Sequence, residues 1–99
     1  MGGDHVEDIY TVEGVCETRF NSTRETIYVK WHKLSECHHV RASVERQMGL
    51  VKSKRVKAII VDVSTARGVP DQATQEWFGE VVFPAYEDHG LKALINIVP

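Results

Sequence analysis

The spacing of hydrophobic residues changes along the chain, and in the first third it favours β-strands. Residues 10–20 are rich in Thr, Val and Phe, and Gly14 in their middle indicates a β-bulge. In residues 26–31, Ile, Val and Trp alternate with Tyr and Lys, which is typical of a strand with one buried face. With turn-forming residues 21–24 between them, the two segments predict a β-hairpin. Residues 1–9 are expected to form a flexible N-terminus.

After the hairpin, apolar residues recur at steps of three and four residues, which is the spacing of an amphipathic helix. Ser35 is a favourable N-cap, and the helix is expected to run for about 16 residues and to stop before Lys57. Residues 58–63 are almost continuously apolar and rich in β-branched side chains, which predicts a central strand covered on both faces. The apolar stripe of the helix is formed by Cys37, Val40, Val44, Met48 and Val51.

A second helix and a last strand complete the pattern. After a loop at 64–70, Asp71 can cap a helix, and Pro84 is expected to kink or end it. Gly90 stands where a helix stop is expected, and residues 91–98 have the composition of another buried strand. The apolar side of the second helix carries Ala73, Trp77, Phe78, Val81 and Val82.

These elements predict an α/β fold, a single-layer mixed sheet in the order β-β-α-β-α-β with helices flanking the sheet. The domain is expected to span residues 10–99 without a repeat or linker. Strand–helix–strand units have right-handed crossovers, so a strand order that runs steadily outward would place both helices on one face. The other face, apolar in the two central strands, would then be bare. We therefore expect dimerisation, domain exchange or a truncated chain.

Composition narrows the class of protein. The 99 residues are 42% hydrophobic and 26% charged, as in a soluble globular domain. No apolar run approaches the roughly 18 residues that cross a bilayer, and the N-terminus lacks the pattern of a secretory signal. Two cysteines suit a reducing cytosol, and a net charge of −2 gives no general attraction to nucleic acid. We expect a cytoplasmic protein with no nucleic-acid partner.

Polar residues gather where the strand at 58–63 ends and the second helix begins. The carboxyl ends of strands in open α/β sheets collect ligands, and a helix N-terminus favours an anion. A structural interpretation stays open, in which these residues only form turns, bond loop amides and cap the helix. The candidate partner-binding residues are Asp62, Ser64, Thr65, Arg67, Asp71 and Thr74.

The sequence predicts neither an enzyme nor a bound cofactor. Ser64 is not part of a G-x-S-x-G elbow, and the Gly-rich motifs of dinucleotide and nucleotide sites are missing from the sequence. A catalytic role for Asp62 and Ser64 would require a strongly raised pKa of Asp62 inside a polar cleft.

Two other groups of residues have both a functional and a structural interpretation. Cys37, His38 and His39, with His32 nearby, are residue types that bind metals, but neighbours on a helix point in different directions. We therefore expect no metal site. Residues 41–57 hold six basic residues against a single Glu, which suits phosphate head groups or merely a solvated helix end. Membrane contact is expected to be peripheral at most.

Four short motifs lie in the second half of the chain: D-x-S at 62–64, T-Q-E-W-F at 74–78, F-P at 83–84 and G-L-K at 90–92. Together they resemble those of bacterial STAS-like proteins, which share the sulfate-transporter and anti-sigma-factor-antagonist fold. The resemblance covers about residues 10–99 and is nearest to small stand-alone members. It implies a mixed sheet that begins with an antiparallel strand and is flanked by helices.

Two departures from the STAS pattern bear on function. Anti-sigma-factor antagonists carry a phosphorylated Ser in a D-S-S-G step, where this chain has Asp71-Gln72-Ala73-Thr74. The usual Ser is missing, so Thr74 is the possible phosphosite. STAS-like domains also continue with another strand and helix beyond the strand that here ends at Pro99. We therefore expect a shortened member or a fragment.

The sequence supports two functions of different kinds. The first is a non-enzymatic interaction or regulatory module of STAS-like type, expected as a homodimer, with its contact surface at 64–74. The alternative is a small-ligand or lipid-binding module of Sec14-like character, with a head group held by residues 41–57. Bound lipid in the purified protein would favour the alternative, and a fully packed core without a cavity would exclude it. The sequence identifies neither the partner nor the ligand.

Overall fold

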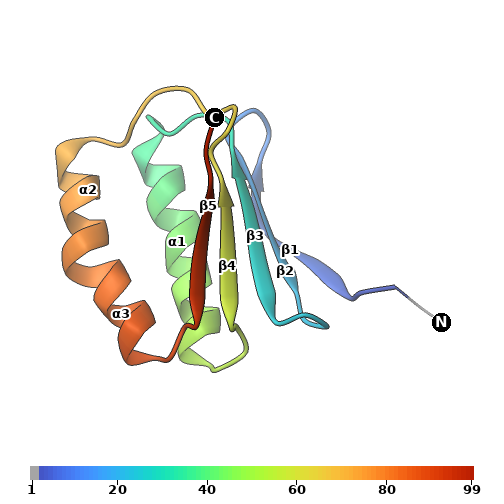
Figure 1. The fold of residues 1–99 in the computed structure, drawn as a ribbon. Coiled ribbons are helices and arrows are strands. Elements are labelled where there is room, and N and C mark those ends of the chain that lie inside the picture. Colours follow the sequence, from blue (N-terminus) through green and yellow to red (C-terminus); the bar gives the residue numbers. More distant parts are fainter. Residues whose placement is uncertain (1–2) are drawn as a thin grey trace.

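A five-stranded sheet with helices along one face is the frame of the molecule (Figure 1), seen in a computed structural model that describes residues 3–99. The spatial order of strands follows the chain, β1-β2-β3-β4-β5. The first three strands are antiparallel, and β3, β4 and β5 are parallel. The elements are β1 (Val6–Val12), β2 (Cys16–Asn21), β3 (Thr26–Trp31), α1 (Cys37–Lys52), β4 (Ala58–Asp62), α2 (Gln72–Trp77), η1 (Phe78–Val82), α3 (Phe83–Asp88) and β5 (Ala93–Ile97).

The N-terminal part of the prediction needs two corrections. Residues 10–20 form parts of two strands rather than one, because Gly14 adopts a φ of +76° in the turn between β1 and β2. The observed order is therefore β-β-β-α-β-α-β. A bulge does occur, but it lies in β1 between Asp8 and Tyr10.

Both crossover connections, through α1 and through α2, η1 and α3, lie on one face of the sheet (Figure 1). The steadily outward strand order requires this arrangement, since each crossover between parallel strands is right-handed. The opposite face carries no helix within residues 3–99, as the sequence predicted. We call it the open face.

The second crossover is one helical stretch over residues 72–88, with a π-helical turn, η1, in its middle. Of the two alternatives expected at Pro84, a kink or an end of the helix, the structure excludes the end, since α3 continues through Pro84 to Asp88. Proline lacks an N–H and its ring crowds the carbonyl four residues earlier, and η1 directly before α3 is the wider turn that accommodates such a residue. Gly90, with a φ of +81°, follows the helix and donates its N–H to the carbonyl of Glu87.

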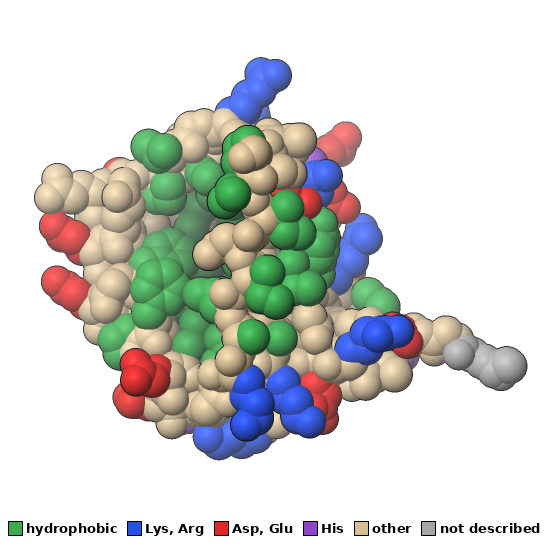
Figure 2. Space-filling view, viewed as in Figure 1, with side chains coloured by type: hydrophobic (Ala, Val, Ile, Leu, Met, Phe, Trp, Pro, Cys, Tyr) green, Lys and Arg blue, Asp and Glu red, His purple; other side chains and the backbone are tan. Residues whose placement is uncertain are grey.

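The core lies between the helical face of the sheet and α1, with the stripe of α1 buried as its period predicts. Phe20, Ile27, Val29 and Ile59 face Val44 and its neighbours on α1. The packing is looser towards the last strand. Figure 2 shows apolar side chains around a hollow between the α2–α3 side of the molecule and β5.

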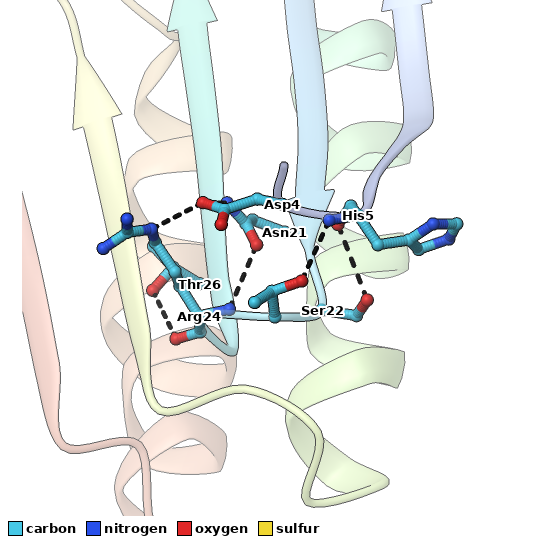
Figure 3. A network of polar contacts seen from close by, with 7 residues as sticks. Asp4, His5, Asn21, Ser22, Arg24 and Thr26 are labelled. Atoms are coloured by element: carbon cyan, nitrogen blue, oxygen red, sulfur yellow. Dashed lines mark hydrogen bonds and ion pairs between the residues drawn. The ribbon is translucent and has the colours of Figure 1, made fainter. Parts of the chain in front are cut away.

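The start of the chain is tied to the β2–β3 turn (Figure 3). Ser22 donates its backbone N–H to the carbonyl of His5 (3.0 Å), and Asp4 accepts from Asn21 and pairs with Arg24. These contacts hold the pKa of Asp4 below its usual value, through the bond from Asn21 first and then that from Arg24.

The predicted flexible N-terminus at 1–9 is therefore wrong for most of its length. Strand β1 already begins at Val6, and residues 4 and 5 are bonded to the β2–β3 turn. The remainder of that prediction, at residues 1 and 2, lies outside the described residues.

Within the part of the chain that the structure describes, no helix is both long and apolar enough to span a membrane.

Candidate functional site

The predicted site at the end of β4 is built around the carboxylate of Asp62, and both of its oxygens accept hydrogen bonds from the protein. Asp62 Oδ1 accepts from the N–H (3.0 Å) and hydroxyl (2.6 Å) of Ser64, and Oδ2 accepts from the hydroxyl of Tyr28 (2.9 Å). These bonds, the side-chain bond from Ser64 foremost, hold the pKa of Asp62 below its ordinary value. A catalytic role required a raised pKa, so this carboxylate has the opposite property.

The loop after Asp62 is fixed by backbone bonds rather than left free for a partner. Arg67 donates its N–H to the carbonyl of His32 (3.0 Å), and its own carbonyl accepts from the N–H of Leu34 (2.8 Å). The structure therefore ties the loop to the connection between β3 and α1. The side chains of Thr65 and Arg67 stay exposed at the surface.

The start of the second helix has the predicted cap but not an accessible phosphosite. Asp71 Oδ1 accepts from the N–H of Thr74 (2.8 Å), and the pKa of Asp71 is lowered first by the nearby side chain of Thr74 and then by this N–H bond. Thr74 itself is fully buried, and its hydroxyl has no partner among residues 3–99. A kinase cannot reach a buried hydroxyl, so the prediction of Thr74 as a phosphosite is wrong. Burial equally removes Thr74 from the predicted contact surface.

The histidines near the start of α1 bond to separate partners. His32 Nε2 lies 3.1 Å from Glu17 Oε2, and His39 Nδ1 lies 2.7 Å from the hydroxyl of Tyr10. Cys37 Sγ accepts from the N–H of Asp71 (3.4 Å). Across the described chain, no three His, Cys, Asp or Glu residues are grouped so as to hold a metal ion.

The basic stretch at 41–57 does not converge on one site. The guanidinium of Arg41 lies 4.8 Å from the ring centre of Trp77, and that of Arg46 lies 5.4 Å from the ring of Tyr10. Further along, Lys54 Nζ donates to the carbonyl of His89 (2.9 Å), and Lys57 pairs with Glu25 (2.8 Å).

An apolar cavity, which the sequence analysis did not locate, lies between the sheet and the helices. It has a volume of about 220 Å³. Four of its lining residues, Trp31, Gln47, Tyr86 and Asn96, have polar atoms in the side chain. The available signal was Gln47 itself, a polar residue on the buried side of α1. The lining residues are Val29, Trp31, Leu34, Val40, Val44, Gln47, Val61, Val63, Pro70, Phe78, Phe83, Tyr86, Leu94 and Asn96.

The last strand, β5, is an exposed edge, whereas the sequence predicted a buried strand. Leu94, Ile95 and Ile97 are 38%, 49% and 40% exposed. Phe83, which lines the cavity with Leu94, is 46% exposed. The sequence could not show this, because an apolar run does not reveal whether another strand pairs with it.

Comparisons of the chain with models of protein families, with curated proteins and with solved structures found no match.

Proposed function

We propose that this protein is a non-enzymatic interaction module that assembles as a homodimer through β5. The single observation that carries the proposal is the difference between the two edges of the sheet. One edge has features that prevent pairing with another strand, and the other edge has none of them.

The β1 edge is protected against strand addition. Glu7 and Asp8 put two carboxylates on the strand, and the bulge between Asp8 and Tyr10 interrupts its pairing pattern. Charge and bulges are the usual means by which sheet edges avoid pairing with other chains.

The β5 edge is apolar and regular. Residues 93–99 contain no charged side chain, and β5 pairs with β4 without a shift in register. Ala93 donates its N–H to the carbonyl of Lys57, and Ile97 accepts from the N–H of Val63, so these residues direct their backbone groups at β4. Backbone direction alternates along a strand, which leaves Leu94 and Asn96 with N–H and C=O groups directed away from the sheet.

A second copy is the occupant that fits this edge. In an antiparallel pair about a twofold axis, Leu94 would bond to Asn96 of the partner subunit and Asn96 to the partner's Leu94. Ile95 would then lie against the partner's Ile95 on the open face, and apolar surface would meet apolar surface. This contact replaces the 64–74 loop as the proposed interface, because that loop is bonded to its own chain and Thr74 is buried.

The expected resemblance to STAS-like regulatory proteins agrees with a module that works through protein contacts. The parallel β3–β4–β5 arrangement with both helices on one face supports the coarse fold of that prediction. The buried Thr74 removes the phosphorylation step from the proposal.

The test is the solution mass from light scattering over a hundredfold range of protein concentration. We expect a dimer for the wild type and a monomer for Ile95→Lys, since a charge at the centre of the pair is costly to bury. Val69→Lys is the matched control, because Val69 is 70% exposed on the loop between β4 and α2, is not part of β5 and should leave the dimer intact.

A second variant tests the backbone contact. Asn96→Pro removes an N–H directed away from β4, and edge strands tolerate proline at such positions. It should also give a folded monomer by circular dichroism and light scattering. A wild-type monomer at every concentration would overturn the proposal, as would a dimer that survives both Ile95→Lys and Asn96→Pro.

A further inference from the structure

We infer that the cavity between the sheet and the helices is a binding site for a small neutral apolar molecule that carries one hydrogen-bond donor. Phenols, indoles and short alcohols belong to this class. The inference goes beyond the proposed dimer, and its chief residue, the buried Gln47, takes no part in the β5 contact, whereas Leu94 and Asn96 belong to both.

Gln47 is a polar residue, held in place by hydrogen bonds, among the mostly apolar residues that line the cavity. It is only 3% exposed, and its Nε2 donates to Ser43 Oγ (3.1 Å). Ser43 Oγ in turn lies 2.6 Å from Thr18 Oγ1, and both residues are fully buried. This chain of bonds holds the amide in one orientation. Among the bonds of the described residues, Gln47 Oε1 accepts none, and it does not belong to the fully buried unpaired atoms, so this acceptor is open to a molecule in the cavity that Gln47 lines.

An accessible acceptor in an apolar wall can bond to a hydroxyl or N–H of a ligand that enters the cavity. Specific sites of small molecules have this composition, a mostly apolar wall with a few placed polar groups. Asn96, an exposed residue that also lines the cavity, adds a second amide on the β5 side.

The lining selects for a neutral ligand. None of the residues that line the cavity is Asp, Glu, Lys, Arg or His. Burial raises the pKa of Tyr86, so this phenol stays uncharged at neutral pH. A phosphate or carboxylate would enter without a partner for its charge, which is unfavourable in an apolar site. The basic residues expected to hold a head group point to Trp77, Tyr10 and other partners instead.

The volume fixes the size of the ligand. A dry apolar cavity of about 150 Å³ binds benzene. A cavity of about 220 Å³ therefore has room for one ring with a short substituent. Phe83, Leu94 and Asn96 combine exposure with lining positions and form the entrance between α3 and β5.

The π-turn shapes the helical wall of this cavity. Residues five apart on a regular α-helix lie about 140° apart around its axis, at 3.6 residues per turn. Phe78 and Phe83 are five apart with η1 between them, and both line the cavity with ring centres 5.6 Å apart. The wider turn thus places two aromatic rings on one side, and π-turns often occur at functional sites.

The test compares p-cresol with toluene, two molecules that differ by one hydroxyl. Binding is followed through ¹H–¹⁵N shifts of the Val61 and Val63 amides and of the Gln47 side chain. We expect wild-type protein to bind both probes and to prefer p-cresol by about threefold to tenfold, the usual value of one net hydrogen bond. Gln47→Met keeps the length of the side chain and should reduce this preference to about one.

Gln72→Met is the matched control, because Gln72 is exposed on α2 and, among residues 3–99, its side chain bonds only to Glu76. It should keep the wild-type preference. If Gln47→Met does not fold, the ratio of the two affinities in the wild type still decides the question. The same titration on Ile95→Lys separates the two proposals, since Ile95 does not line the cavity and a monomer should still bind.

Three results would overturn the inference. The first is the absence of any shift at the cavity amides with either probe at millimolar concentration. The second is equal binding of p-cresol and toluene by the wild type, or a preference that persists in Gln47→Met. The third is tighter binding of octanoate than of octanol, which would show a site for anions.

Discussion

Two fully buried threonines, Thr18 and Thr74, differ in whether the hydroxyl has a partner. Thr18 shares a bond of 2.6 Å with Ser43, whereas Thr74 Oγ1 has no partner within residues 3–99. A buried hydroxyl without a bond loses its hydration without compensation, so the same chemical group has opposite effects at the two positions.

Thr74→Val should therefore stabilise the protein, since it removes the unpaired hydroxyl and keeps the shape of the side chain. We expect the free energy of unfolding in urea to rise by about 1 kcal/mol. Thr18→Val is the paired control and should lower it by about 1 kcal/mol, because it breaks the bond to Ser43. A loss of stability in Thr74→Val would contradict the unpaired state of Thr74.

The carboxylate of Asp62 gives a pH dependence of known sign. Its pKa in the folded protein is below the ordinary value of 3.8, so the ionised form is stabilised by folding. This stabilisation is complete above the ordinary pKa and is lost as the pH falls through the folded value. The difference in unfolding free energy between wild type and Asp62→Asn should be largest near neutral pH and should shrink below about pH 4.

The ionisation of Tyr28 provides an independent test of the hydrogen bond between Tyr28 and Asp62. Its hydroxyl donates to Asp62, and this bond is the main reason that the pKa of Tyr28 is raised. In Asp62→Asn the Tyr28 phenol should ionise at lower pH, measured from its ultraviolet absorbance. An unchanged Tyr28 titration would mean that the bond is not formed in solution.

At the residue scale, the sequence placed Asp62 and Ser64 together at the end of a strand, and they are bonded. It also identified Asp71 as a cap. It failed at Thr74, because the pattern of the first helical turn does not show which side of the helix meets the core. Gln47 was missed for a related reason, since a polar residue within an amphipathic helix is not conspicuous by type alone.

Among the connections between elements, the loop after β4 depends on a close approach. Gly68 has a φ of +75°, and a Cβ at this position would lie 3.2 Å from the Cβ of Ser35. Gly14 has nearly the same φ, +76°, with open space around it. A side chain at Gly14 would cause backbone strain alone, whereas one at Gly68 would cause the same strain and a steric contact as well. Comparing substitutions at the two positions therefore separates the two effects.

Gly14→Ala should lower the free energy of unfolding by about 1 kcal/mol, through the left-handed φ alone. Gly68→Ala should cost more, because Ser35 must also move. In a Ser35→Gly background the cost of Gly68→Ala should fall to that of Gly14→Ala, measured by urea denaturation. If Gly14→Ala and Gly68→Ala lowered the free energy of unfolding equally in the wild-type background, the contact with Ser35 would contribute no measurable cost.

Among elements, long and periodic segments were predictable and polar or interrupted ones were not. The stripe of α1 and the alternation of β3 were correctly read from the sequence. Strand β1 begins in an acidic segment that has no apolar alternation to indicate a strand, and so its first residues were missed. The sequence left open whether Pro84 kinks or ends the second helix, because the π-turn that accommodates the proline has no sequence signature.

At the scale of the whole molecule, the sequence predicted the bare face but not the cavity or the exposed edge. The bare face follows from the order of strands and the handedness of crossovers, which are general rules. A cavity depends on how side chains of distant elements meet, as those of α1, α3 and β5 do here. No local pattern contains that information.

The proposed assembly through β5 would make thermal stability depend on protein concentration. A tenfold increase adds about 0.7 kcal/mol per chain when dissociation and unfolding are coupled. For a domain of this size, the melting temperature should rise by about 3–6 °C per tenfold. Ile95→Lys should melt at one temperature at all concentrations, measured by circular dichroism. A wild type that behaves in the same way would count against the dimer.

The unequal edges of the sheet also limit how far growth can proceed. In a dimer paired through β5, both β5 edges are occupied. The outer edges of the joined sheet are then the two β1 strands, which carry Glu7 and Asp8. Under the proposed pairing, addition would therefore stop at two subunits and a ten-stranded sheet, because neither outer edge favours another strand. A sheet with two open edges would polymerise without limit. The two carboxylates and the bulge in β1 would thus prevent further strand addition, although β1 lies at the opposite edge of the sheet from β5.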